Sequence, residues 1–245
     1  MGATGHNGTA TPPKSRTKWL IAGGAAAAAL IAVIVIVALI PTPTPTPPPP
    51  PPAPPPLDPA ALNSLLLTPD EIDTIMGTTN LEPGEIFTAM TTEPPSISDP
   101  ACVGAQFNAV QAVYQGSGYS TVADQTLSGD QPKYTYVNQT AVLFPSAAQA
   151  GAFLSTSADA WKRCAGQTLT VTMTDGKTYN WTFDDVTEDD ARIAHTASQE
   201  GMGGYACQHV VRVVSNAVLE VQACQDDVSD EADSMAAKMA GKAPA

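Results

Sequence analysis

Four cysteines have the number and spacing that most directly predict chemistry in this sequence of 245 residues. They are Cys102, Cys164, Cys207 and Cys224. An even number favours disulfide bonds in an oxidising compartment, and four cysteines allow three pairings. Two β-rich runs, 205–214 and 217–225, flank Ser215-Asn216, and a two-residue turn there places Cys207 opposite Cys224. This pair falls on a position without mutual hydrogen bonds, where Cα atoms approach to about 4.5 Å, so we expect a disulfide between them.

The other two cysteines, Cys102 and Cys164, are then left to each other and close a longer loop. The same hairpin register puts a set of apolar residues on one face, which we expect to face the core: Val210, Val214, Ala217, Leu219, Val221 and Ala223. No two cysteines have the C-x-x-C spacing of zinc sites, so we expect no zinc.

Two histidines, His195 and His209, are the candidates for acid–base chemistry in the C-terminal half of the sequence. On the expected hairpin, His209 faces Gln222 and lies diagonal to Glu220. A Ser–His–acid site is conceivable, but the sequence has no Gly-x-Ser-x-Gly nucleophile elbow. We therefore expect surface or hydrogen-bonded polar histidines, assign no catalytic residue, and favour a protein that is not an enzyme.

An acidic cluster is the other group whose residue types could bind a ligand. It contains Asp184, Asp185, Glu188, Asp189 and Asp190, but its spacing fails the EF-hand pattern for calcium. We expect a solvated loop here, with no metal and no cofactor. The nearby Gly201, Gly203 and Gly204 precede a strand rather than a helix, which predicts a flexible turn and not a phosphate loop.

Aromatic residues supply the candidate ligand-binding surface. Five of them could stack on a sugar or an apolar ligand: Tyr114, Tyr119, Tyr134, Tyr136 and Trp181. Together with His209 they form our candidate ligand-binding set. The alternative is that these side chains pack in the core.

Four helices are predicted to position these residues. The clearest starts at Thr68, whose side chain and that of Glu71 form a capping box, and ends at Gly77. A shorter helix is expected over 58–66. A third runs from Pro145-Ser146 to about Cys164, and a last helix covers 230–240 with Met235 and Met239 facing inward.

Antiparallel strands make up most of the remaining sequence. We predict a strand–turn–strand over 103–128, a strand over 134–144, and a hairpin of 168–173 with 177–183 around Asp175-Gly176. The cysteine-containing hairpin follows, and residues 81–101 are expected to be loop. Runs of antiparallel strands with segregated helices indicate an α+β fold.

The N-terminal part of the sequence has a different composition. Residues 19–40 are an uninterrupted uncharged run, long enough as a helix to cross the ~30 Å hydrocarbon core of a bilayer. In the next segment, 41–56, 12 of 16 residues are proline, which predicts a polyproline II stalk reaching roughly 50 Å. We call residues 57–245 the head, and expect one folded domain there.

Charge predicts the orientation of this span. Lys14, Arg16 and Lys18 precede it, and no charge follows until Asp58, so we expect 1–18 in the cytoplasm and the head outside. The alternative is a cleaved secretory signal. The apolar run is longer than such a signal's core, and no small-x-small cleavage site ends it, so we favour an uncleaved anchor in a single-pass cell-membrane protein.

The head is strongly acidic. It holds eight of the 11 Lys/Arg residues and all 24 Asp/Glu residues, for a formal charge of −16. This balance argues against nucleic acid as a partner and against the head lying on an anionic membrane surface.

Several of these features together resemble the PknH-like extracellular sensor domain. They are the run LLLTPDEIDTIMG (65–77), the segment Tyr114-Gln115-Gly116-Ser117-Gly118-Tyr119, the alanine-rich helix carrying Trp161, and the spacings of the four cysteines. The family occurs outside the membrane on mycobacterial receptor serine/threonine kinases, and on kinase-free membrane proteins and lipoproteins. The resemblance covers about 60–242. It implies an α+β fold with an antiparallel sheet, two disulfides and a polar cleft suited to a ligand.

The sequence departs from a receptor kinase, because its Gly-rich loop, Val-Ala-Ile-Lys and His-Arg-Asp motifs are missing. We therefore expect ligand sensing but not phosphorylation. We interpret the chain as a sensor-like module that binds a small molecule or a cell-envelope component, with a possible partner membrane protein. Two rivals stay open: a cell-envelope hydrolase, and a structural protein that binds cell-wall polymer or a partner ectodomain. The ligand, the signalling partner, the oligomeric state and any cleavage of the anchor stay open too.

Overall fold

The computed structural model describes residues 56–79, 81–130 and 133–244. The cytoplasmic tail, the transmembrane helix over 19–40 and the stalk over 41–56 that the sequence predicts lie outside these residues, apart from Pro56. Within the described ranges, no helix is both long and apolar enough to cross a bilayer.

One antiparallel sheet organises the head. Its strands are β1 (Glu82–Pro83), β2 (Ser96–Ile97), β3 (Thr121–Gly129), β4 (Thr135–Leu143), β5 (Thr168–Thr172), β6 (Thr178–Phe183), β7 (Thr187–Asp189), β8 (Arg192–Gln199), β9 (Tyr205–Val214) and β10 (Ala217–Asp226). Their order is β1-β3-β4-β10-β9-β8-β6-β5-β2, and β7 pairs with β8 beside this path. Every pair is antiparallel.

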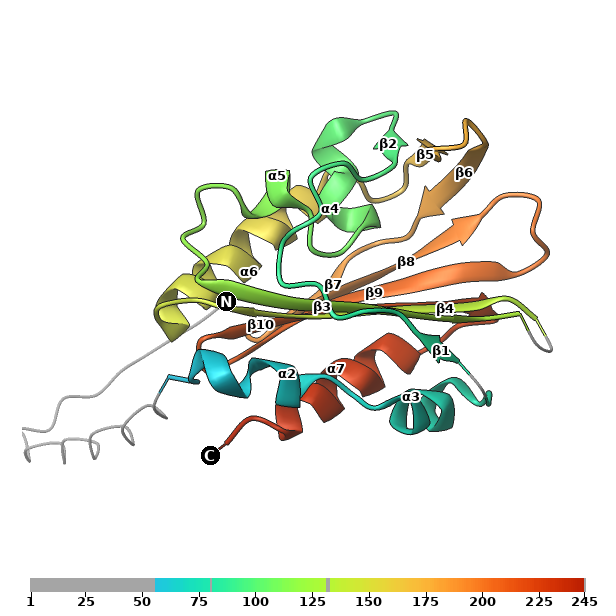
Figure 1. Cartoon of the computed structure of the whole chain (residues 1–245). Coiled ribbons are helices and arrows are strands. Elements are labelled where there is room, and N and C mark those ends of the chain that lie inside the picture. The colour runs from blue at the N-terminus through green and yellow to red at the C-terminus, as the bar shows by residue number, and fades with distance from the viewer. Residues whose placement is uncertain (1–55, 80, 131–132, 245) are drawn as a thin grey trace, which may run out of the picture. The chain divides into compact units, whose positions relative to one another are not determined.

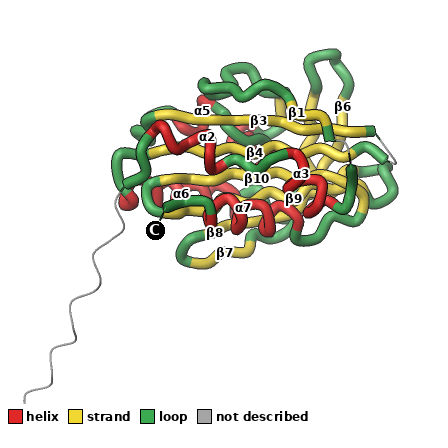
Figure 2. Tube along the Cα trace, turned by 60° about the horizontal axis from the view of Figure 1, so that its bottom comes forward, coloured by secondary structure: helices red, strands yellow, loops and turns green. Residues whose placement is uncertain are grey.

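Helices cover both faces of the sheet (Figure 1). The described helices are η1 (Pro59–Ala61), α2 (Leu62–Leu65), α3 (Pro69–Met76), η2 (Pro100–Cys102), α4 (Val103–Gln106), α5 (Gln111–Tyr114), α6 (Ala147–Lys162) and α7 (Glu231–Gly241). We call the side with α4, α5 and α6 the α6 face. Figure 2 looks onto the opposite side, the α7 face, which α2, α3 and α7 cover. This arrangement confirms the α+β prediction.

Because both faces are covered, alternate residues of the central strands enter two different cores. On β10, Leu219 and Val221 join Met235 and Met239 of α7 in the core of the α7 face. Val218, the residue before Leu219, joins the core of the α6 face. Most residues of β9 and β10 are therefore buried, and the remaining ones are half-buried. The apolar face predicted for this hairpin is confirmed, but it is only one of two buried faces.

The hairpin register and both disulfides are as predicted. Cys207 pairs with Cys224 across β9 and β10, and Ala217 with Val214 next to the turn. The Cys207–Cys224 disulfide joins Cα atoms 4.0 Å apart, and Cys102–Cys164 joins Cα atoms 5.8 Å apart. The Cys102–Cys164 disulfide links the end of η2 to the residues just after α6.

Helix starts follow the predicted capping signals. Thr68 caps α3 with both hydrogen bonds of a capping box, and Gly77 ends the helix with a left-handed φ of 65°. Ser146 caps α6 by accepting from the Gln149 amide. The pattern of Ser146 followed by Gln149 also predicts the reciprocal bond of a capping box, but the Gln149 side-chain oxygen instead accepts from the Ser146 hydroxyl.

Three predicted segments differ from the structure. The first strand expected within 103–128 is wrong, since α4 and α5 occupy its place. Contacts distant in sequence decide this segment: Cys102 is bonded to Cys164, and polar groups of 105–109 bond to the sheet below. In a second segment, neither β8 nor β7, which forms within the acidic residues expected as loop, was predicted. Residues 81–101, also expected as loop, contain β1 and β2.

Candidate functional site

A row of polar side chains crosses the α6 face of the sheet. Asn138, Gln222, His209 and His195 are paired in register across β4, β10, β9 and β8. Their side chains point to the same face because strand residues in register share a side of the sheet. All four are buried. The prediction that His209 faces Gln222 is therefore confirmed, but the pair lies inside the molecule.

A second polar row runs beside the first. It joins Asp124 of β3, Thr140 of β4 and Glu220 of β10, and all three are buried. Asp124 Oδ1 accepts from the Thr140 hydroxyl at 2.5 Å and from Asn138 Nδ2 at 3.0 Å. Such a concentration of buried polar groups persists only when most of them have hydrogen-bond partners.

The segment 105–109 supplies many of those partners. The Ala105 carbonyl accepts from His195 Nε2 at 2.8 Å and from His209 Nδ1 at 3.0 Å. The Gln106 carbonyl accepts from Gln222 Nε2 at 2.7 Å. The Ala109 amide, held at a φ of 52°, donates to Glu220 at 2.8 Å. Backbone atoms of this segment therefore cap the polar rows.

Burial changes the proton affinity of both carboxyl groups. It raises the pKa of Glu220 to about 7, against the Ala109 amide bond, which lowers it. It also raises the pKa of Asp124. The Tyr114 hydroxyl lies near Glu220, and burial raises its pKa as well. Burial therefore shifts all three groups toward their neutral forms, because the buried site solvates charge poorly.

The two histidines are buried and neutral. Loss of solvation lowers the pKa of His209 to about 3, and it lowers the pKa of His195 as well. The rings pack against Trp161, with centroids 4.9 Å away for His195 and 4.5 Å for His209. Among the described residues, no hydroxyl or carboxylate hydrogen-bonds to either ring. The arrangement matches that of hydrogen-bonded structural histidines and offers no nucleophile–base pair.

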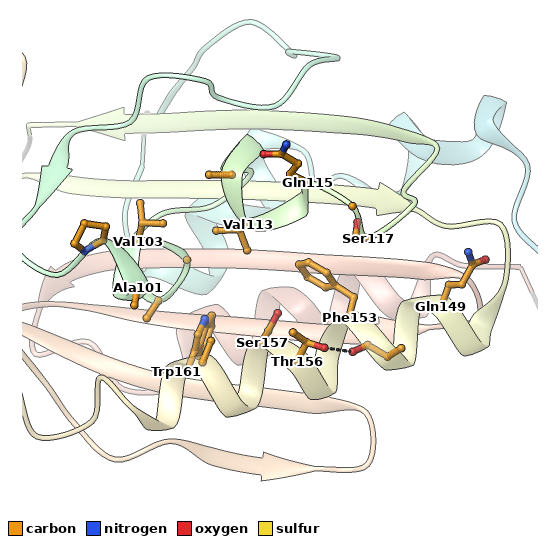
Figure 3. Close-up of a pocket in the computed structure, with 17 residues that line it drawn as sticks. Ala101, Val103, Val113, Gln115, Ser117, Gln149, Phe153, Thr156, Ser157 and Trp161 are labelled. Carbon is orange, nitrogen blue, oxygen red and sulfur yellow. Dashed lines mark hydrogen bonds between the residues drawn. The ribbon is translucent and has the colours of Figure 1, made fainter.

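One cavity lies between α6 and the segment that contains α4 and α5 (Figure 3). Its volume is about 580 Å³. Phe153 and Trp161 form its aromatic part, and small residues such as Gly104 and Ala152 form much of the rest. The Thr156 hydroxyl at its edge already donates to the Ala152 carbonyl. None of the six predicted ligand-binding residues lines this cavity.

A second cavity, of about 530 Å³, has a different character, and we call it the aromatic cleft. Its lining is Pro95, Gln106, Phe107, Tyr134, Tyr136, Val171, Met173, Tyr179, Trp181, Gln199, Met202, Tyr205, Cys207, Gln222 and Cys224. Both cavity volumes fall in the range of ~300–1,000 Å³ that small-molecule sites occupy.

The curvature of the sheet brings the cleft's walls together. One wall comes from Tyr136 of β4, and the opposite wall from Val171 of β5 and Trp181 of β6. Three strands, β10, β9 and β8, separate these walls in the sheet order. In Figure 1, β5 and β6 rise out of the plane of β3 and β4. The Cys207–Cys224 disulfide lies between the walls, on the central strands.

The aromatic side chains of the cleft contact one another. The Tyr134 and Tyr205 rings have centroids 6.1 Å apart, and the Trp181 and Tyr205 rings 6.2 Å. Burial raises the pKa of Tyr136 and of Tyr205, so both keep their hydroxyl protons. The cleft therefore offers ring faces together with neutral hydroxyl groups.

The structure separates the predicted ligand-binding residues into two groups. Tyr134, Tyr136 and Trp181 line the aromatic cleft together. Tyr114, Tyr119 and His209 do not: Tyr114 stacks on Phe153 in the core, and its ring edge meets Tyr119. Tyr114 therefore packs in the core and Tyr119 packs against it, as the alternative stated for these aromatic residues expects.

Sequence reasoning missed Tyr179, Tyr205, Gln106 and Gln222 as cleft residues. A signal for two of them was present, because side chains two apart on a strand share a face. Tyr179 lies two residues before Trp181, and Gln222 two before Cys224. Nothing in the sequence pattern places Gln106 near Trp181 or Cys224.

The acidic residues 184–190 are exposed or half-buried and lie away from the cleft lining. Glu188 pairs with Lys162 at 2.7 Å, and Asp189 accepts from the Ala191 amide. In the described part of the chain, no three His, Cys, Asp or Glu side chains are grouped as a metal site would require. Gly201, Gly203 and Gly204, all with positive φ, form the turn before β9.

Comparison with known proteins connects the chain to one family. Residues 57–242 match the family model described as the PknH-like extracellular domain. The serine/threonine-protein kinases PknH of Mycobacterium bovis and Mycobacterium tuberculosis are 39% identical to the chain over 188 residues, which is 76% of this chain. The chain spans only 31% and 30% of the length of these kinases.

A solved structure agrees with the sequence comparison. The crystal structure of the extracellular domain of PknH from Mycobacterium tuberculosis superposes with a TM-score of 0.73 at 39% sequence identity. The match covers 77% of this chain and 97% of that chain. The similarity therefore includes nearly the whole of that domain.

Proposed function

We propose that this chain, which belongs to the PknH-like extracellular domain family, is a membrane-anchored sensor-like module that binds a small ligand outside the cytoplasm. In this proposal the apolar run 19–40 anchors the chain, the proline-rich segment 41–56 acts as a stalk, and the head carries the binding site. The charge bias of Lys14, Arg16 and Lys18 supports an external head.

One observation carries the binding role: the aromatic cleft collects five aromatic side chains of the sheet and its turns around one cavity. They are Tyr134, Tyr136, Tyr179, Trp181 and Tyr205. Three of the large apolar residues that are exposed to solvent stand at this cavity: Tyr134, Met173 and Met202. Exposed apolar groups gathered around a cavity are typical of binding sites, because exposure without a partner is costly.

The proposal is a binding role and not a catalytic one. A hydrolase would need a nucleophile beside a base, and among the described residues the buried His195 and His209 side chains hydrogen-bond to the Ala105 carbonyl, not to a hydroxyl or carboxylate. The cleft lining contains no serine, histidine or acidic residue among those described. The kinase activity of the longer relatives is not part of the proposal.

The test compares ligand retained by the natively purified full chain with that retained by two single variants. Tyr134→Ala removes a rim side chain that is 50% exposed, so the fold should survive. Phe87→Ala is the matched control, since Phe87 is 54% exposed but lies outside the cleft. Native mass spectrometry would measure the fraction of each protein that carries a small molecule.

We expect the parent and Phe87→Ala to retain the same small molecule, and Tyr134→Ala to retain much less of it. Equal retention by all three proteins would place the ligand elsewhere and contradict the proposal. So would retention that is lost in Phe87→Ala and kept in Tyr134→Ala.

A further inference from the structure

We infer that the aromatic cleft binds an uncharged, hydroxylated ring, the chemistry of a neutral sugar. This inference rests on the proposed binding function and specifies the class of ligand. Three properties of the cleft carry it: a lining without charge, a buried amide oxygen that lacks a partner, and ring faces on both walls.

The lining is free of charge although the head as a whole is highly charged. None of the described residues that line the cleft is Asp, Glu, Lys, Arg or His. The head nevertheless carries all 24 acidic residues of the sequence. A charged ligand group would lose solvation in the cleft without gaining an opposite charge, which is strongly unfavourable. The cleft therefore selects against charged ligands.

Gln106 supplies the unpaired acceptor. It lines the cleft, is only 5% exposed, and its Oε1 has no hydrogen-bond partner among the described residues. A buried acceptor without a donor costs free energy that a bound ligand can recover by donating to it. Gln222, which also lines the cleft, already uses its Nε2 to bond the Gln106 carbonyl, which fixes α4 above this position. The ligand is therefore expected to carry an O–H or N–H donor.

The aromatic walls decide between the remaining neutral ligands. The Trp181 and Tyr205 rings lie 6.2 Å apart at an angle of 61°, and Tyr134 extends the surface to the rim. Aromatic faces carry partial negative charge and attract the weakly positive C–H groups of a sugar ring. A wholly apolar ligand would use these faces but leave Gln106 unpaired.

An aromatic surface can also bind a quaternary ammonium ion. Three acidic residues influence the cleft tyrosines: Asp130 acts on Tyr134, Asp124 on Tyr136 and Asp226 on Tyr205, and none of them lines the cleft. Asp226 is engaged by the Lys133 ammonium in an ion pair, and buried Asp124 by Thr140 and Asn138. No carboxylate is among the described residues that line the cleft, where it would contact a bound cation directly. We therefore assign the neutral class and use a cation as one arm of the test.

The experiment uses three sugars of one ring type and a cation: methyl glucoside, glucuronate, glucosamine and choline. Each would be titrated against the full chain in lipid nanodiscs, with saturation-transfer NMR as the readout. The same titrations would be made with Tyr134→Ala, with Gln106→Leu, and with the control Phe87→Ala.

We expect methyl glucoside to bind the parent and Phe87→Ala equally, and both cleft variants about tenfold more weakly. Gln106→Leu should fold, because replacing an unpaired buried amide by an apolar side chain of similar size costs little stability. Glucuronate, glucosamine and choline should bind at least about tenfold more weakly than methyl glucoside, since each brings an unpaired charge.

Equal or tighter binding of a charged compound would overturn the neutral class. So would absence of binding by methyl glucoside, or binding that neither cleft variant reduces. These failures differ from failure of the proposed function: a native ligand that Tyr134→Ala fails to retain would keep the cleft as a binding site while excluding a neutral sugar.

Discussion

The two faces of the sheet use the same strands for different purposes. On the α7 face, α2, α3 and α7 cover aliphatic side chains such as Leu219 and Met235. Most of its polar groups are paired, as where Gln139 bonds both backbone groups of Leu67, and Arg212 Nε is an exception. The α6 face carries buried carboxyl and imidazole groups, several polar atoms without partners, and both cavities.

This difference indicates that different interactions stabilise the two faces of one domain. Apolar burial with few unpaired polar groups stabilises the α7 face, and that stability can offset the cost of polar burial on the other side. The α6 face is instead held by a covalent bond, Cys102–Cys164, and by backbone bonds from segment 105–109. Changes on the two faces should therefore have different consequences, which the following experiments measure.

The largest effect should come from the α6 face. Replacing Cys102 and Cys164 together with alanine removes a cross-link between residues 62 apart in sequence. Loop-closure entropy predicts a loss of about 4 kcal/mol in the free energy of unfolding, measured by urea denaturation. Removing Cys207–Cys224, with a separation of 17, should cost about 3 kcal/mol. A smaller loss for the longer loop would contradict this account.

On the α7 face, a single cavity-creating change should lower stability without touching ligand binding. Met235→Ala removes a fully buried side chain of α7 and should cost about 3 kcal/mol. Chemical denaturation measures the loss, and retention of the native ligand by the folded fraction checks the second point. Loss of ligand from protein that is still folded would show that the two faces are coupled.

The buried carboxyl of Glu220 should make stability depend on pH. Its pKa is raised to about 7 in the folded state, above the unfolded value near 4.3, so the folded state holds the proton more tightly. Its stabilising effect is complete below the unfolded pKa and is lost as pH rises through about 7. The free energy of unfolding of Glu220→Gln, relative to that of the parent, should therefore rise by on the order of 2 kcal/mol between pH 5 and pH 8.

The histidines act in the opposite direction, which the measurement must separate. The pKa of His209 is lowered to about 3, so its contribution is lost as pH falls below the unfolded value near 6.5. Because both proteins contain this histidine, the difference between their melting temperatures isolates Glu220. A difference that is constant with pH would show that Glu220 ionises normally.

A moderate effect is expected where local sequence alone forms the structure. Thr68→Ala removes the side-chain acceptor of the Glu71 amide at the start of α3, and should cost about 1 kcal/mol. Thr68→Ser retains the hydroxyl and serves as the control. Equal melting temperatures for the two variants would mean that the cap contributes nothing measurable.

The smallest effect should come from the acidic residues outside both faces. Replacing Asp184, Asp185, Asp189 and Asp190 with asparagine should leave the fold and ligand retention nearly unchanged, with a slight gain possible from reduced self-repulsion. Thermal melting with and without calcium measures this. A melting temperature that rises with calcium in the parent alone would establish a metal site and contradict the cleft.

Sequence reasoning succeeded where neighbouring residues decide the structure. Capping at Thr68 and the hairpin around Ser215-Asn216 depend on a few adjacent side chains, and that hairpin register was enough to pair Cys207 with Cys224. Sequence reasoning failed for residues 103–114, where β-forming residues such as Val110 and Val113 lie in or beside short helices. The Cys102 disulfide and bonds to the sheet hold that segment, and neither is local.

The candidate site shows the same limit. The pairs Tyr134/Tyr136 and Tyr179/Trp181 each show strand alternation, so each pair could be placed on one face. That the two pairs line one cavity depends on how far the sheet curves between β4 and β6. The unpredicted strand β8 lies within that curve, so the cleft could not be assembled from the predicted strands.

The opposed walls of the aromatic cleft belong to one continuous hydrogen-bonded sheet, and this has a mechanical consequence. A cleft between two domains closes about a hinge, whereas here the ladder from β4 through β10, β9 and β8 to β6 sets the gap. Widening or narrowing the gap would require bending the whole set of paired strands. The Cys207–Cys224 disulfide links β9 and β10 in the middle of that set. Under the proposed binding function, we therefore expect the cleft to select ligands by their thickness and to lose little conformational entropy on binding.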